Sequence, residues 1–141
     1  MGKKRVIKKG GEQGAAGAAP SARSKRKLDS GTLYVEATFN NTKLSLGDNA
    51  GNIVAWSSSG SLGFSGAKKG TPFAAAKVGE TLGERAGAMG LKDVAVVVKG
   101  VGAGRESSIR GFVSKGIDLR SIKDVTPVPH GGVRPPKARR I

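Results

Sequence analysis

The sequence predicts an α/β sandwich with a mixed β-sheet, on three observations. Over residues 33–39 and 43–46, apolar and polar residues alternate with the period of two that a half-buried strand requires. Residues 75–89 instead carry apolar side chains at helical spacings of three and four. Residues 93–98 form a run rich in β-branched side chains. Three strands followed by helix, strand, helix and strand indicate a mixed sheet in which a parallel crossover is right-handed.

The first three strands are predicted to form an antiparallel meander. Apolar residues alternate from Leu33 to Phe39, which predicts a strand with one buried face. Asn40-Asn41 tolerates a positive φ and fits a tight hairpin turn. The same alternation over residues 43–46, and a further apolar segment over 53–56 after a Gly/Asn-rich turn, predict the other two strands.

A long Gly/Ser-rich loop over residues 57–71 separates the meander from the first helix. Loops of this length are uncommon in small domains and usually have a function, and this one carries Lys68 and Lys69. Thr71 followed by Pro72 predicts where the helix begins, because threonine can cap it and proline suits its first position.

Three glycines lie four residues apart along this helix, at Gly79, Gly83 and Gly87. Each costs about 1 kcal/mol relative to alanine, so together they indicate a close approach of the helix to a sheet or to an RNA backbone. They adjoin the apolar stripe, which favours packing in the core. Gly90 is predicted to end the helix.

The second half of the domain is predicted to hold a central strand, a short helix and a last strand. The apolar run over residues 93–98 suits a strand that is covered on both faces. A glycine-rich loop over residues 100–104 leads into a helix from about Arg105 to Lys115. Residues 119–125 then form the last strand before a proline-rich tail.

The charge distribution divides the chain into a nearly balanced body and two cationic ends. The net charge is +15 over 141 residues, of which residues 1–27 contribute +8 and residues 128–141 contribute +4. Such arms favour a nucleic-acid partner, because each neutralised phosphate releases condensed counterions. We therefore predict a disordered basic arm over residues 1–28, an α/β nucleic-acid-binding domain over 29–126 and an extended basic tail over 127–141.

The composition argues against an enzyme, a metal site and a membrane protein. The chain has no cysteine, one histidine and ten scattered acids, which leaves no carboxylate cluster for metal-dependent phosphoryl transfer. It has no apolar run of the ~20 residues that span a bilayer and no signal-peptide-like start. A membrane-surface arm is disfavoured because the basic clusters lack an apolar face. We predict a soluble cytoplasmic protein without catalytic residues, metal or cofactor.

Two junctions between a glycine loop and a helix are the candidate phosphate sites of the body. Glycine amides before a helix start form an electropositive concavity, and an arginine fork can grip two phosphate oxygens. The loop after residue 100 fits neither a dinucleotide-binding motif nor a P-loop, and a plain tight turn with solvated arginines is the alternative. If the strands before the two helices lie side by side, both junctions would form one phosphate-binding edge, with serine hydroxyls beside it. The candidate residues are Ser57, Ser58, Ser59, Lys68, Lys69, Thr71, Gly102, Gly104, Arg105 and Arg110.

The C-terminal tail combines prolines with regularly spaced cations. Prolines at positions 127, 129, 135 and 136 hold the segment extended at low entropy, so its basic side chains can follow a phosphate track. Gly131 allows a bend against a nucleotide. The candidate contacts are His130, Arg134, Lys137, Arg139 and Arg140.

Several linked motifs, in order, resemble the family of small-ribosomal-subunit protein eleven. The resemblance covers about residues 30–141 and leaves the N-terminal arm without a match. Bacterial members commonly read Pro-His-Asn-Gly-Cys where this chain reads Pro-His-Gly-Gly-Val at residues 129–133, so an isoaspartyl linkage is not expected, and Gly131 preserves the bend. The matching segments are Phe39-Asn40-Asn41-Thr42, Gly51-Asn52, Trp56, Gly63-Phe64 to Lys69, residues 71–75, residues 100–107 and residues 124–127.

The resemblance implies a ribonuclease-H-like sandwich without catalysis that serves as a structural part of the small ribosomal subunit. It implies that the chain bridges ribosomal RNA helices on the platform, near messenger RNA at the Shine-Dalgarno cleft and small-subunit proteins seven and eighteen, without forming a homo-oligomer. The RNA-contacting positions carried over are residues 57–69, Arg105 with its glycine loop, and residues 127–140. A free nucleoid or RNA-chaperone module and a phosphoryl-transfer enzyme are the alternatives.

Overall fold

The computed structural model describes residues 27–140, so almost all of the predicted N-terminal arm lies outside the described residues. Within this range, no helix has the length and apolar character needed to cross a membrane. The elements in chain order are β1 (Ser30–Ala37), β2 (Thr42–Gly47), β3 (Ile53–Ser58), the 3-10 turn η1 (Gly66–Gly70), α1 (Pro72–Ala88), β4 (Asp93–Lys99), α2 (Gly104–Val113) and β5 (Asp118–Asp124).

The described strands form one mixed sheet in the order β3-β2-β1-β4-β5. Strands β1, β2 and β3 pair antiparallel, which is the predicted meander, whereas β4 pairs parallel with β1 and with β5. The register places Leu33 of β1 between Leu46 of β2 and Val96 of β4. The predicted α/β sandwich with a mixed sheet is thereby confirmed.

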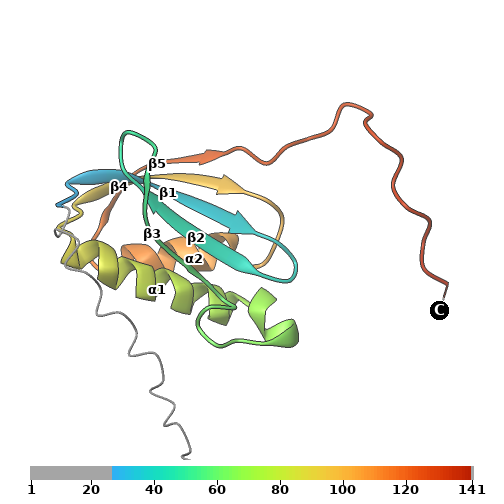
Figure 1. The fold of residues 1–141 in the computed structure, drawn as a ribbon, viewed down its shortest axis with the longest axis horizontal. Helices are drawn as coiled ribbons and strands as arrows, with labels where there is room; N and C mark the ends of the chain where they lie inside the picture. The colour runs from blue at the N-terminus through green and yellow to red at the C-terminus, as the bar shows by residue number, and fades with distance from the viewer. Residues whose placement is uncertain (1–26, 141) are drawn as a thin grey trace, which may run out of the picture.

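Both helices cover the same face of the sheet (Figure 1). The core lies between these layers, where alternate strand residues pack against Val78, Leu82 and Phe112 of the helices. The prediction that β4 is covered on both faces is wrong, because no described element forms a third layer. On β4, alternate residues are buried by the helices, whereas Ala95 and Val97 are half-buried on the opposite face.

Two of the three glycines of α1, Gly79 and Gly83, allow close contact between α1 and the α2 segment. A Cβ atom on Gly79 would lie 2.2 Å from the carbonyl oxygen of Ser108 on α2. Reciprocally, a Cβ atom on Gly111 of α2 would lie 2.4 Å from the carbonyl oxygen of Ala76. Gly87 faces open space instead. The core interpretation is therefore confirmed for Gly79 and Gly83, with a helix as the packing partner, and is wrong for Gly87.

Two boundaries differ from the sequence prediction. β1 ends before Thr38, because the Thr38 N–H donates to the carbonyl of Asn41 at 2.8 Å and closes the hairpin turn. Phe39 therefore lies outside the strand and is 78% exposed. Leu28, predicted to belong to the arm, packs on the core and donates its N–H to the carbonyl of Met89 at 3.1 Å. The folded body thus includes Leu28.

Candidate nucleic-acid interface

Three connections meet at one end of the sheet (Figure 1), which we call the hairpin end. A Cβ atom on Gly70 would lie 2.2 Å from the carbonyl oxygen of Phe39, and one on Gly102 would lie 2.4 Å from that of Thr38. The β1–β2 turn is therefore held between the other two connections, which approach it as closely as only glycine permits. The hairpin end consists of residues 38–41, 66–70 and 100–104.

The two helix junctions lie at one edge of the sheet, as predicted, but not for the predicted reason. The strands before the two helices, β3 and β4, do not lie side by side, because β2 and β1 separate them in the sheet. The two helix junctions come together for a different reason, since each contacts the β1–β2 hairpin that lies between them.

The glycine loop before α2 is shaped mainly by packing. Gly104 is buried, and a Cβ atom there would lie 2.1 Å from Thr42 Oγ1 and 2.8 Å from Ala75 Cβ. Gly102 is half-buried against the hairpin turn. Ala103 stands at the N-cap and provides no side-chain acceptor for the amides of the first turn of α2. These two glycines thus position the start of α2 against the hairpin.

The start of α1 places two lysines at the hairpin end. Thr71 caps the helix as predicted, since its Oγ1 accepts from the Ala74 N–H at 3.3 Å. The same hydroxyl donates to the carbonyl of Lys68 at 2.7 Å, which ties η1 to α1. The Thr71 hydroxyl is therefore engaged within the protein. Lys68 is exposed and Lys69 is half-buried on this turn.

The serine-rich segment is more buried than its polarity suggested. Ser57 and Ser59 are 2% and 0% exposed, so their hydroxyls lie inside the protein and do not reach a surface ligand. The reason is that the N–H of Ser59 continues the pairing by donating to the carbonyl of Thr42 at 3.0 Å. Ser58 is half-buried, and its hydroxyl accepts from the N–H of Ser61 at 3.2 Å.

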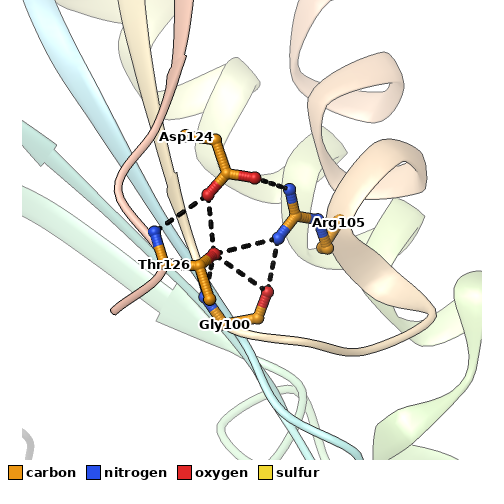
Figure 2. Close-up of polar contacts among 4 residues, drawn as sticks. All are labelled: Gly100, Arg105, Asp124 and Thr126. Atoms are coloured by element: carbon orange, nitrogen blue, oxygen red, sulfur yellow. Dashed lines mark hydrogen bonds and ion pairs between the residues drawn. The ribbon is translucent and has the colours of Figure 1, made fainter. Parts of the chain in front are cut away.

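Arg105 joins the start of α2 to the ends of β4 and β5 (Figure 2). Its Nη1 donates to the carbonyl of Gly100 at 2.5 Å and to Thr126 Oγ1 at 3.2 Å, and its Nη2 donates to Asp124 Oδ2 at 2.5 Å. Asp124 Oδ1 in turn accepts from the N–H and the hydroxyl of Thr126 at 2.9 and 2.6 Å. We call these four residues the tail latch, because the C-terminal tail begins directly after them.

The tail latch changes the expected role of Arg105. Both terminal nitrogens of its guanidinium are engaged within the protein, so the fork is not free for phosphate in this arrangement. Hydrogen bonds from the Thr126 side chain and backbone, followed by those from Arg105, hold the pKa of the Asp124 carboxyl well below its usual 3.8. The carboxylate therefore stays charged at neutral pH, and the latch sets where the tail leaves the body.

Lysines carry the unpaired positive charge at the hairpin end. Arg110, the other predicted arginine contact, forms an exposed ion pair with Glu106. Arg105 is paired with Asp124. In the part of the chain that the structure describes, neither Lys68 nor Lys69 forms an ion pair. Of the four cations predicted at the two junctions, the two lysines are therefore unpaired and the two arginines are paired within the protein.

The C-terminal tail runs outward from the hairpin end without helix or strand (Figure 1). Positive φ values of 93° and 51° at Gly131 and Gly132 place a bend beside His130, as predicted for Gly131. Every residue from Pro127 to Arg140 is exposed. The candidate tail contacts His130, Arg134, Lys137, Arg139 and Arg140 are therefore all accessible.

Sequence reasoning missed three exposed residues in this region. Phe39 lies at the tip of the hairpin, and the signal for it was its position directly before the Asn40-Asn41 turn. Lys43 and Lys99 flank Glu36 across the sheet, which only the strand register shows.

Two sequence comparisons with known proteins identify the family of this chain. The sequence model of a family described as ribosomal protein S11 matches residues 31–140. The small ribosomal subunit protein uS11 of Solibacter usitatus (strain Ellin6076) is 50% identical over 119 residues, which cover 84% of this chain and 88% of that protein. The chain therefore belongs to the ribosomal protein S11 family.

Proposed function

We propose that this protein binds small-subunit ribosomal RNA with the hairpin end and the C-terminal tail acting as one phosphate-contacting surface. Membership of the ribosomal protein S11 family makes the chain a structural constituent of the small ribosomal subunit and not an enzyme. It also implies association with ribosomal RNA and with other ribosomal proteins. The residues that contact RNA, and the way they do so, are the proposal.

The tail latch is the observation that carries the proposal. It fixes the root of a tail with four cations to the end of the sheet that holds Lys68 and Lys69. The turn that carries Lys68 and Lys69 and the cationic tail therefore extend from the same end of the sheet. Because each phosphate contact releases counterions, placing both segments on one RNA adds their contributions without the cost of orienting them independently.

The length of the tail supports bridging between RNA helices. The 14 residues from Pro127 to Arg140 are extended and exposed, and a chain of that length reaches about 45 Å. Lysine and arginine contacts to phosphate position a protein but carry no sequence information. We infer that the body orients on one RNA segment while the tail follows another, through backbone contacts and without base readout.

Family membership supports the finer placement that we propose for the chain. It would lie on the platform of the small subunit in the cytoplasm, beside the messenger RNA at the Shine-Dalgarno cleft. Its protein neighbours there would be small-subunit proteins seven and eighteen.

The salt dependence of RNA binding tests the proposed function. We expect the full chain to bind small-subunit ribosomal RNA, and the double substitution Arg134→Ala with Arg139→Ala to flatten the log–log salt slope by about one unit per lost contact. The matched control removes two cations from the opposite end of the sheet, through Lys92→Ala with Arg120→Ala, and should leave the slope unchanged. Equal losses in both variants would contradict a localised surface.

Sedimentation separates this proposal from a free nucleic-acid-binding module. The chain should migrate with small ribosomal subunits at moderate salt and detach only at high salt. Recovery mainly with DNA would favour a nucleoid protein instead.

A further inference from the structure

The sheet has a second face that no described element covers. Both helices pack on the other face (Figure 1), so alternate strand residues point away from the core. Adjacent strands lie about 4.8 Å apart, so the side chains of this open face, which we call the platform, stand in neighbouring rows across the sheet. One row across it, given by the strand register, consists of Trp56, Ser45, Tyr34, Val97 and Lys123.

A shallow apolar hollow lies at the β3 edge of this platform. Trp56 and Ile53 are 54% and 51% exposed. With Lys43 and Ser45 they line a cavity of about 250 Å³. This is smaller than the roughly 300–1,000 Å³ of pockets that enclose a small molecule. Such a site suits one flat group that lies against an aromatic ring.

The side chains of Tyr34 and Ile53 meet over the buried Gly47, next to this hollow. Gly47 of β2 has no side chain there, and a Cβ atom on it would lie 3.2 Å from Tyr34 Cε2 and 3.7 Å from Ile53 Cδ1. Side chains from β1 and β3 thus approach the same space above β2. Two aromatic residues, Trp56 and Tyr34, therefore belong to one surface.

The charge of the open face complements a polyanion. Lys43 and Lys99 flank Glu36 in the row next to the aromatic one, and Lys123 ends the aromatic row. Among the described residues, none of these three lysines forms an ion pair. Protein–protein interfaces are depleted of lysine and of charge at their cores. One unpaired lysine, Lys43, beside the exposed Trp56, and two more on β4 and β5 across the same face, therefore favour nucleic acid over a protein partner.

We propose that the open face binds an unpaired stretch of ribosomal RNA, with a base stacked on Trp56 and a phosphate at Lys43. Aromatic side chains on an exposed sheet are a sequence-tolerant platform for the bases of single-stranded RNA. Lys43 is the second residue of β2 and lies directly beside the hairpin end, so the platform extends that surface. The inference rests on the proposed function, because it assigns a second contact to the same partner.

Tryptophan fluorescence tests the platform directly, since Trp56 is the only tryptophan in the chain. Titrating the full chain with the single-stranded RNA octamer rA8 should quench this fluorescence to saturation. Trp56→Leu has no tryptophan, so its affinity is measured by filter binding. It should bind rA8 about tenfold more weakly, which matches the stacking energy of one base on an aromatic ring. Trp56→Phe should retain most of the affinity. The control Phe73→Leu removes an exposed aromatic ring from α1 and should leave the rA8 affinity unchanged.

The outcomes separate this inference from the proposed function. The first outcome is that rA8 does not quench Trp56 fluorescence and that Trp56→Leu does not change the rA8 affinity. If ribosomal RNA still binds with a tail-dependent salt slope, the platform is then overturned and the proposed function stands. If the full chain binds no ribosomal RNA, both are overturned. Ultraviolet cross-linking in assembled small subunits gives a second readout: a Trp56 cross-link to RNA supports the platform, and one to a ribosomal protein overturns it.

Discussion

The two ends of the sheet are built from the same strands but differ in charge. Opposite the hairpin end lies the turn end, made of residues 28–29, 48–52, 89–92 and 116–118. Outside α1 and α2, the hairpin end and its adjoining strand residues carry five bases and two acids. The turn end and its adjoining strand residues carry two bases and four acids. The first group is Lys43, Lys68, Lys69, Lys99, Lys123, Glu36 and Asp124, and the second is Lys92, Arg120, Asp29, Asp48, Asp93 and Asp118.

The difference supports the proposal that the hairpin end binds RNA, because the two ends share the same strands and differ in where their charges lie. At the turn end, three of the six charged side chains bond locally: Asp48 accepts from the N–H groups of Ala50 and Asn52 at 2.9 Å, and Arg120 pairs with Asp93. At the hairpin end, lysines remain without acidic partners, among the residues that the structure describes. Unpaired cations beside a cationic tail are what an RNA backbone requires.

The largest expected effect comes from removing the lysines of the hairpin end. Lys68→Ala with Lys69→Ala should weaken binding to small-subunit ribosomal RNA about 50-fold at 0.1 M salt, if each lysine contacts one phosphate and the salt slope is about 0.9 per contact. Filter binding measures this affinity. The paired control at the turn end, Lys92→Ala with Arg120→Ala, should change affinity less than threefold. A similar loss at both ends would remove the distinction between them.

A smaller effect is expected from opening the tail latch. Arg105→Ala should weaken RNA binding about tenfold, because the tail then has to be ordered during binding, but the salt slope should not change. A slope that falls by about one unit would instead identify Arg105 as a phosphate contact. Arg110→Ala, which removes a neighbouring arginine paired with Glu106, is the matched control and should leave affinity nearly unchanged.

The smallest expected effect is the loss of tail-latch stability at low pH. Because the pKa of Asp124 in the folded chain lies below its usual 3.8, the latch contributes stability above that pH and loses it as the pH falls through the lower folded value. The carboxyl carbon of Asp124, followed by NMR, should therefore titrate below pH 3.8. Thr126→Val removes the largest cause of the shift and should move the midpoint upward. A midpoint at or above 3.8 in the unsubstituted chain would show that the latch does not form in solution.

Most of the fold could be predicted from local patterns. Alternation predicted β1 and β2, and an apolar segment after a turn predicted β3. The Thr71-Pro72 pair predicted the start of α1, and β-branched residues predicted β4. The errors came from tertiary context. An apolar run cannot show that β4 is covered on one face only, and alternation cannot show that the turn at Asn41 leaves Phe39 outside β1.

The candidate site was less predictable, because the sequence shows residue types and not their partners. Gly102 and Gly104 indicate a close approach, but whether to phosphate or to the hairpin depends on the packed structure. Arg105 carries a positive charge in either case, and only the fold brings Asp124 and Thr126 to it across 19 and 21 residues. The extended and exposed conformation of the tail was predictable, because prolines and charged residues favour it without any tertiary contact.

Directed hydroxyl-radical probing from the two ends tests the central claim most directly. The chain contains no cysteine, so Ala67→Cys at the hairpin end and Ala50→Cys at the turn end each provide one attachment point for an iron chelate, and both positions are exposed. In small subunits assembled with either derivative, we predict strong ribosomal RNA cleavage from residue 67 and weak cleavage from residue 50. Stronger cleavage from residue 50 would contradict the account.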